Sequence, residues 1–206
     1  MSENTSTVFV VDDDESVGRA LGRLLRGAGY SVEVCMSAEA FIECTQPDGP
    51  ACAVVDLAMP GMNGLELQAR LADENRDIGV VFLTGHGDIP AGVRAMKQGA
   101  VDFLIKPVDE SSLLQAIDLA LDLQQQIIDS RRQSAALQQR FDSLSGRERE
   151  VLHLVVDGLL NKQIAAELGI SEKTVKVHRS RVMHKTGART AAQLARLFVA
   201  AETNNT

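Results

Sequence analysis

Five short apolar segments alternate with segments of helical periodicity between residues 8 and 105. The apolar segments are rich in Val, Ile and Leu, as is typical of strands that are buried on both faces of a sheet. The strands are predicted at Val8–Val11, Ser31–Cys35, Ala53–Asp56, Val80–Thr84 and Asp102–Ile105, and the helices at Glu15–Ala28, Ala38–Thr45, Gly64–Glu74 and Ile89–Gln98. This alternation predicts an α/β fold with a doubly wound, five-stranded parallel sheet. The functional crevice of such a sheet lies beyond the carboxyl ends of its strands.

The rest of the chain is helical in pattern. One helix is predicted from about residue 110 to about residue 141, because this segment contains no Gly or Pro. Its irregular heptads leave two interpretations open, a solvated helical spacer and a dimerising coiled coil. Four shorter helices are predicted at Gly146–Asp157, Asn161–Leu168, Glu172–Thr186 and Thr190–Ala201. The expected domains are 1–122 (α/β), 123–142 (a helical linker continuous with the preceding helix) and 143–206 (all-α, four helices).

The charge of the chain is unevenly distributed. The 206 residues carry a net charge of −7, which as an average argues against a nucleic-acid partner. Residues 1–122 contain 8 basic and 20 acidic residues, whereas residues 143–206 contain 10 basic and 6 acidic residues. An acidic part is therefore joined to a weakly basic part, and the two parts are expected to have different partners.

Several sequence features bear on the location of the protein. We find no apolar run long enough to span a membrane, and the first residues lack the basic start and cleavage site of a signal peptide. The three cysteines, Cys35, Cys44 and Cys52, share no metal-ligand spacing and are interpreted as small buried thiols. These features predict a cytoplasmic protein with no membrane partner.

Acidic and polar residues follow the predicted strands. Asp12 and Asp13 follow the first strand, Asp56 ends the third, Thr84 ends the fourth, and Lys106 follows the fifth. Each alone has an ordinary structural explanation, such as a helix N-terminus, a strand-end cap, a turn hydroxyl or an exposed lysine. Together they converge at one edge of the sheet. A carboxylate cluster there is costly without a cation, and its oxygen ligands suit Mg²⁺. With Lys106 and Thr84, it predicts a cradle for a phosphoryl group.

The motifs VVDDDES, VVDLAMPGMNGLEL, FLTGHGD and AVDFLIKP resemble the receiver domain of two-component response regulators over residues 5–125. The resemblance implies that Asp56 accepts a phosphoryl group from a sensor histidine kinase. It also implies a site for Mg²⁺ or Mn²⁺, formed by Asp12, Asp13, Asp56 and the backbone carbonyl of Ala58. The resemblance further implies that Lys106 contacts the phosphoryl oxygens and that Thr84 shifts toward the phosphoryl group. It implies that Phe103 turns inward as a switch, and that the Lys106–Pro107 peptide bond is cis.

The basic end of the chain contains a helix-turn-helix pattern. On its own, the basic helix Glu172–Thr186 has a solvated helix as its ordinary alternative. The segments REREVL, NKQIAAELGIS and TVKVHRSRVMHKTG resemble the LuxR-type DNA-binding domain, which implies that this helix enters the major groove. The implied DNA-binding residues are Lys176, Val177 and Ser180 at base edges, Lys162, Thr174, Arg179 and Lys185 at the backbone, and the outward basic residues Lys173 and Arg181.

The whole chain resembles the FixJ-like subgroup of the NarL/FixJ regulators. The hypothesis is a phosphorylation-dependent transcription factor that binds double-stranded promoter DNA as a homodimer, with RNA polymerase as a further partner and activation as the expected effect. It would not be an enzyme beyond its own phosphoryl transfer and aspartyl-phosphate hydrolysis. One alternative is a phosphate-independent DNA-binding dimer with a vestigial receiver. A phosphatase of the haloacid-dehalogenase type is disfavoured, because the chain lacks the Asp-x-Asp-x-Thr run and a cap domain.

Overall fold

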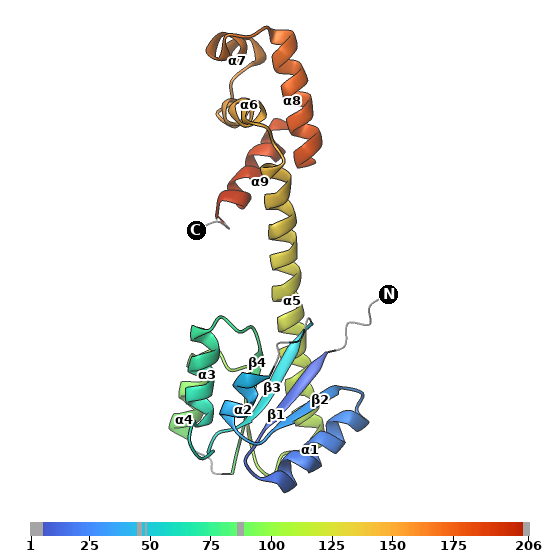
Figure 1. Ribbon diagram of the computed structural model, residues 1–206, viewed down its shortest axis with the longest axis vertical. Coiled ribbons are helices and arrows are strands. Elements are labelled where there is room, and N and C mark those ends of the chain that lie inside the picture. Colours follow the sequence, from blue (N-terminus) through green and yellow to red (C-terminus); the bar gives the residue numbers. More distant parts are fainter. Residues whose placement is uncertain (1–5, 45–46, 48, 86–88, 204–206) are drawn as a thin grey trace. The chain divides into compact units, whose positions relative to one another are not determined.

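A computed structural model of the chain describes residues 6–44, 47, 49–85 and 89–203. The chain forms two compact units, residues 1–128 and 129–206, and the helix α5 (Glu110–Asp142) contributes to both (Figure 1). Among the described helices, none combines the length and the apolar character needed to cross a bilayer. The domain bounds expected from the sequence lie close to this division and stay a prediction.

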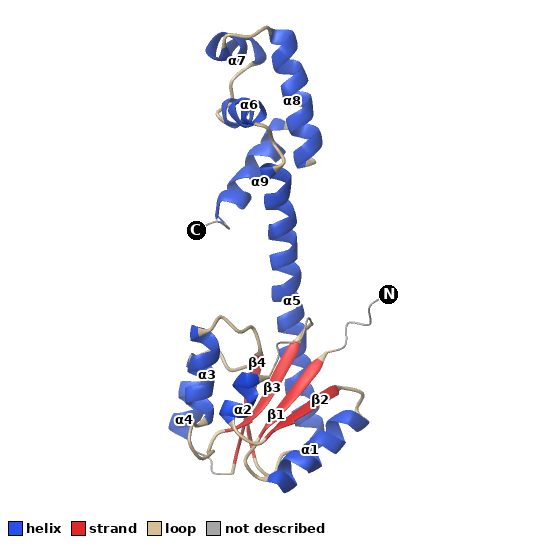
Figure 2. Cartoon of the chain, viewed as in Figure 1, coloured by secondary structure: helices blue, strands red, loops and turns tan. Residues whose placement is uncertain are grey.

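The first unit contains a five-stranded sheet, shown in red in Figure 2. Its strands are β1 (Thr7–Val11), β2 (Ser31–Cys35), β3 (Ala51–Asp56), β4 (Gly79–Thr84) and β5 (Asp102–Ile105). The strands lie in the order β2-β1-β3-β4-β5, and all neighbours are parallel. The predicted doubly wound α/β fold is therefore confirmed. Because β1 and β3 are neighbours at the centre, their carboxyl ends lie beside each other.

Helices cover both faces of the sheet. They are α1 (Glu15–Gly27), α2 (Ala38–Glu43), α3 (Gly64–Asp73), α4 (Ile89–Lys97) and the first part of α5. Successive strand residues point to opposite faces: Phe9 packs in one core with residues of α2, α3 and α4, whereas Val10 packs in a second core with residues of α1 and α5. This double burial explains why the strand segments are almost wholly apolar. The last predicted residue of the second helix, Thr45, lies outside the described residues.

Local sequence fixes the helix that follows the acidic site. The Asn63 side chain accepts a hydrogen bond from the N–H of Glu66, and the Glu66 carboxylate accepts one from the N–H of Asn63, which forms a capping box at the start of α3. Gly64 is the first residue of α3, and a Cβ there would lie 2.7 Å from the backbone oxygen of Asp56. The absence of a side chain therefore lets α3 begin directly against the end of β3.

The second unit is all-helical, as predicted. The end of α5 packs with α6 (Gly146–Val156), α7 (Asn161–Leu168), α8 (Glu172–Thr186) and α9 (Ala191–Thr203). Gly169, in the left-handed conformation with a φ of 63°, ends α7 and turns the chain toward α8. The core is formed by fully buried apolar residues of the four shorter helices, namely Val151, Ile164, Val175, Val182 and Leu194.

Candidate functional site

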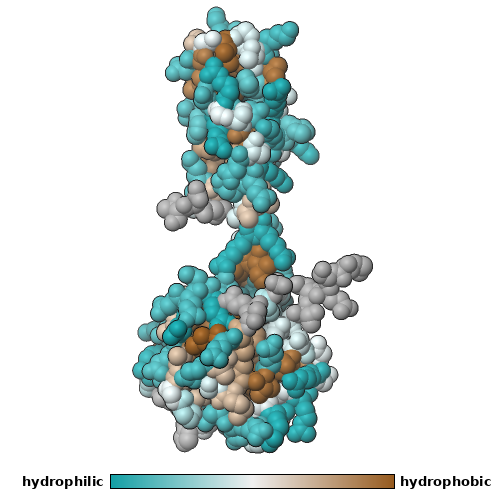
Figure 3. Space-filling view, in the orientation of Figure 1, coloured by the Kyte–Doolittle hydropathy of each residue, from teal (hydrophilic) through white to brown (hydrophobic). Residues whose placement is uncertain are grey.

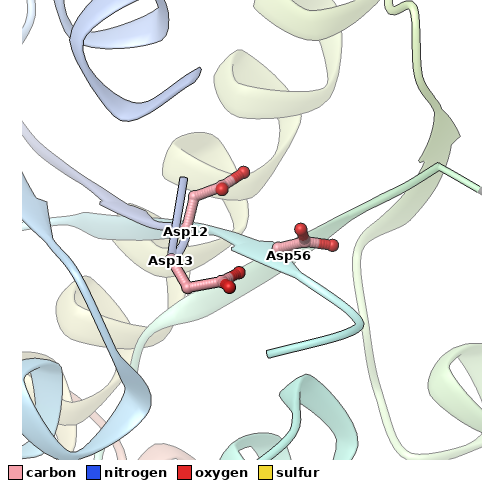
Figure 4. Close-up of side chains that lie close together, drawn as sticks. All are labelled: Asp12, Asp13 and Asp56. Atoms are coloured by element: carbon pink, nitrogen blue, oxygen red, sulfur yellow. The ribbon is translucent and has the colours of Figure 1, made fainter. Parts of the chain in front are cut away.

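Three carboxylates meet at the carboxyl ends of β1 and β3 (Figure 4). Asp12 and Asp13 directly follow β1, and Asp56 is the last residue of β3. One oxygen of each carboxylate lies within 4.8 Å of the corresponding oxygens of the other two. Asp12 is only 1% exposed, whereas Asp13 is exposed to solvent. The sheet thus brings together the three acidic residues that the sequence analysis singled out.

Lys106 supplies positive charge to this cluster. Its Nζ donates hydrogen bonds to Asp12 Oδ2 at 2.7 Å and to Asp56 Oδ2 at 2.9 Å. Partial burial by itself lowers the pKa of Lys106, but the hydrogen bonds and charges of Asp12 and Asp56 outweigh it, and the pKa is raised above its usual value. The ammonium group therefore stays charged at neutral pH. The bond between Lys106 and Pro107 is cis, as the resemblance implies.

The donor set fits a hard divalent cation. When the three carboxylates are ionised, the single charge of Lys106 leaves an excess of two negative charges. The remaining donors are carboxylate oxygens, which Mg²⁺ and similar ions prefer. Asp12 Oδ1 accepts a hydrogen bond from the N–H of Asp14, and Asp56 Oδ1 accepts one from the N–H of Ala58. Asp12, Asp13 and Asp56 are therefore the residues that could hold a metal ion.

Thr84 and Phe103 lie on the next two strands. Thr84 is buried at the end of β4, and its carbonyl oxygen accepts a hydrogen bond from the N–H of Lys106 at 2.7 Å. Phe103 lies on β5 opposite Phe82 of β4 and is partly buried. A Cβ on Gly92 of α4 would lie 3.2 Å from the Phe103 ring. The absence of a side chain on Gly92 therefore lets α4 pack closely over the ring.

An apolar groove lies along α4 and β5, with a volume of about 660 Å³. Its lining includes Phe103 and three apolar residues that are about half exposed, namely Val93 (49%), Met96 (47%) and Ile105 (56%). The sequence predicts a role for Phe103 but for none of the other three residues. The spacing of Val93 and Met96 on one helix face was the available signal, although nothing in the sequence showed that these side chains are half exposed.

The predicted DNA-binding residues lie on α8, except for Lys162, which lies on α7. Lys162, Lys173, Lys176, Val177, Ser180 and Arg181 are exposed, whereas Thr174, Arg179 and Lys185 are partly buried. In the view of Figure 3, the surface of the helical unit is predominantly hydrophilic. A basic helix that is exposed along most of its length is suitable for insertion into a major groove.

Two of these basic residues have partners within the helical unit. Arg179 donates a hydrogen bond to Asn161 Oδ1 at 3.0 Å. The Nζ of Lys185 donates to the carbonyl oxygen of Ser143 at 2.9 Å and to the buried Glu148 carboxylate at 2.7 Å. Glu148 also accepts from the N–H of Ser145, which completes the capping box of α6. Lys185 thus joins α8 to α6, a structural role that its sequence position did not reveal.

The ion pair between Glu148 and Lys185 should make the helical unit sensitive to acid. The hydrogen bond from Lys185, followed by that from Ser145, lowers the pKa of Glu148 from 4.5 to about 2. The Glu148 carboxylate therefore contributes to the free energy of unfolding above pH 4.5, and this contribution is lost as the pH falls toward 2. We expect Glu148→Gln to cost on the order of 2 kcal/mol at pH 7 and to reduce this acid sensitivity.

Hydrogen exchange of the buried amides of Val151 and Val182 in the full chain, at pH 6 and pH 3, measures the effect. Glu150→Gln is the matched control, because Glu150 forms an ion pair with Arg147 on the surface, where such pairs contribute less than about 1 kcal/mol. Equal effects of the two substitutions at pH 6 would contradict the role given to Glu148.

Comparisons with known proteins agree with this architecture. Residues 8–118 match the family "response regulator receiver domain", and residues 142–198 match "bacterial regulatory proteins, luxR family". The chain is 47% identical to nodulation protein W of Bradyrhizobium diazoefficiens, with 92% of this chain and 84% of that protein covered. It is 42% identical to the transcriptional regulatory protein FixJ of Rhizobium meliloti, with 94% and 95% covered. The chain is a response regulator of the FixJ type.

Solved structures support the same assignment for this FixJ-type regulator. The structure of the response regulator StyR has a TM-score of 0.86 and 50% identity, with 94% of this chain and 98% of that chain covered. Full-length FixJ from B. japonicum has a TM-score of 0.58 and 37% identity, with 96% and 97% covered. The protein is thus a two-component transcription factor with a receiver and a LuxR-type DNA-binding domain, and not a conventional enzyme. Its class implies a kinase and DNA as partners.

Proposed function

We propose that Asp56 of this FixJ-type regulator accepts a phosphoryl group from a sensor histidine kinase, and that this event controls promoter binding. The observation that carries the proposal is the grouping of Asp12, Asp13 and Asp56 around the Nζ of Lys106. A carboxylate can act as the nucleophile that forms an aspartyl phosphate. The complete set of acidic and basic groups argues against a vestigial receiver.

The residues of the site have distinct tasks in this proposal. Asp12, Asp13, Asp56 and the backbone carbonyl of Ala58 would hold Mg²⁺ or Mn²⁺. When bound, this ion neutralises charge on the phosphoryl oxygens. Lys106 holds a fixed positive charge against Asp56 and would contact the same oxygens. The N–H of Ala58 donates to Asp56 Oδ1 and helps to orient the carboxylate.

Thr84 and Phe103 would transmit the effect of phosphorylation from Asp56 to the surface of the receiver. Attraction of the Thr84 hydroxyl to the phosphoryl group would make space into which the Phe103 ring can turn. Phe103 lines the groove along α4 and β5, so its movement would change the surface formed by Val93, Met96 and Ile105. This groove is the surface on which we place the activated homodimer, because burial of half-exposed apolar side chains favours association. A local charge event would thereby shift a two-state equilibrium.

In the dimer, two copies of α8 would read paired half-sites on double-stranded promoter DNA. The net positive charge of residues 143–206 is modest, so one copy should bind DNA weakly. Phosphorylation would raise the affinity for DNA by joining two copies on one site. We further propose that the protein activates transcription through RNA polymerase and that it acts in the cytoplasm. For α5, the solvated helical spacer and the dimerising coiled coil both stay open as interpretations. Leu119, Leu123 and Ile127 are exposed on that helix at a spacing of four residues.

Beryllofluoride binding tests the acceptor site. Beryllofluoride mimics a phosphoryl group on a carboxylate, so the full chain should bind it only in the presence of Mg²⁺. Asp56→Asn should abolish this binding, because the amide lacks the carboxylate charge. Fluorine NMR of the bound species provides the measurement.

The matched control for this test is Asp109→Asn. It removes one carboxylate at the start of α5, where Asp109 accepts a hydrogen bond from the N–H of Ser112, and should leave binding unchanged. Binding without Mg²⁺, or binding that survives Asp56→Asn, would contradict the proposed site.

A further inference from the structure

Two of the three cysteines lie side by side at one edge of the receiver sheet. Cys35 is the last residue of β2, an edge strand, and Cys44 directly follows α2. Their Sγ atoms are 3.5 Å apart, and all three cysteines are free thiols. Cys52 is fully buried in the core on the opposite face of the sheet. The chain therefore contains a close dithiol pair and a separate, enclosed thiol.

The position of Cys44 is held by Arg76. The guanidinium group of Arg76 donates hydrogen bonds to the carbonyl oxygens of Ile42 at 2.7 Å and of Cys44 at 3.1 Å. It also lies 5.5 Å from the centre of the Phe41 ring. These contacts hold the end of α2 against the segment between α3 and β4. The proximity of the two sulfur atoms thus depends on a defined tertiary contact, because the two cysteines lie nine positions apart in the chain.

The two thiols differ in accessibility. Cys35 is 6% exposed, whereas Cys44 is partly exposed. Burial, followed by the hydrogen bond with Cys44, raises the pKa of Cys35 to about 12. Cys44 is therefore the thiol that an external reagent reaches first. Cys44 Sγ donates a hydrogen bond to the Ala40 carbonyl oxygen at 3.3 Å; a sulfur donor makes only a weak hydrogen bond, so little opposes a turn of this side chain toward Cys35.

We propose that Cys35 and Cys44 form a reversible dithiol site that closes to a disulfide on exchange with a low-molecular-weight disulfide, such as oxidised glutathione. In the first step, the Cys44 thiol loses its proton to solvent and attacks one sulfur of the reagent, which forms a mixed disulfide and releases one thiolate. In the second step, Cys35 loses its proton to solvent and attacks Cys44 Sγ, and the second thiolate leaves. The protein loses two electrons and two protons, and the reagent becomes two thiols.

The required movement is small. A disulfide bond measures about 2.05 Å, so the sulfur atoms must approach by about 1.5 Å from their observed separation. Bond formation would also affect the neighbourhood of the acidic site, because the carbonyl oxygen of Cys35 accepts a hydrogen bond from the N–H of Asp12 at 3.2 Å. The thiol chemistry itself is independent of phosphorylation at Asp56. A chain that is not phosphorylated at Asp56 should therefore still form the disulfide, and a chain that forms no disulfide could still be phosphorylated.

The test treats the reduced full chain with a series of ratios of oxidised to reduced glutathione. The reaction is quenched with acid, and the remaining thiols are alkylated in denaturant and analysed by mass spectrometry. Cleavage after Glu39, Glu43 and Asp48 places Cys35, Cys44 and Cys52 in separate peptides, so a disulfide appears as two joined peptides that identify its two cysteines. We expect Cys35 and Cys44 to lose reactivity together and Cys52 to remain alkylated. Dithiothreitol should restore all three thiols.

Three variants test whether the disulfide is specific to Cys35 and Cys44. Cys52→Ala should form the disulfide as the natural chain does. Cys44→Ser should leave Cys35 at least ten-fold less oxidised under the same conditions, because the buried thiol then lacks its partner. Cys44→Ala provides a second test if the serine variant fails to fold. A stable mixed disulfide at Cys44 with Cys35 still free, a disulfide that includes Cys52, or three free thiols at every ratio would overturn the proposal.

Discussion

Asp56→Asn should make DNA binding insensitive to a small phosphodonor. In the natural chain, we expect acetyl phosphate and Mg²⁺ to increase affinity for a selected promoter fragment about ten-fold or more, which corresponds to about 1.4 kcal/mol. The amide of Asn has nearly the same size as the carboxylate but is not a nucleophile, so no phosphoryl bond can form. The ratio of dissociation constants with and without the donor should therefore fall to about one.

The measurement is fluorescence anisotropy on a labelled fragment that the natural chain has selected from genomic DNA. Asp109→Asn is again the matched control, because it removes one negative charge from the receiver but leaves the triad intact; it should keep the full response. An unchanged response in Asp56→Asn would refute Asp56 as the acceptor. A natural chain that binds DNA tightly and ignores the donor would instead favour the vestigial receiver.

The fold and the acidic site were predictable because both depend on short-range pattern and topology. Continuous apolar segments such as Val8–Val11 are typical of central parallel strands, and β–α alternation leaves few arrangements of such strands. Once the strands are parallel, residues that follow them must share one edge of the sheet. Asp12, Asp56 and Lys106 could therefore be grouped from the sequence, although the first and the last are 94 positions apart.

Contacts that depend on side-chain direction could not be predicted in the same way. Lys185 looks like other basic residues of its helix, yet its Nζ contacts Glu148, which lies 37 residues earlier. The proximity of Cys35 and Cys44 depends on where Arg76 holds the end of α2. Residue type and spacing show that a lysine or cysteine is present, but only tertiary packing shows which group it faces. The same limit applies to the groove along α4 and β5.

The second large effect is expected at Lys176, which is exposed on α8. If Lys176 contacts a base edge, Lys176→Ala should weaken specific binding by about 1–3 kcal/mol, or roughly 5-fold to 150-fold. The loss should be concentrated on fragments that carry the preferred base at one position. Anisotropy titrations against fragments with single base-pair changes provide the measurement. Arg23→Ala, which removes an exposed positive charge from the receiver, is the control and should change affinity little.

The salt dependence of binding separates a base contact from a phosphate contact. A lysine that only neutralises a phosphate adds about 0.9 to the slope of log affinity against log salt concentration, and its loss weakens all DNA sequences alike. Lys162→Ala should show this uniform behaviour, because Lys162 lies on α7 and is expected at the DNA backbone. Lys176→Ala should relax the preference at one position. Lys176 would instead be a contact to the DNA backbone if Lys176→Ala weakened binding to every fragment equally and only lowered the salt slope. Val177 and Ser180 on the same helix would then be the residues expected to contact base edges.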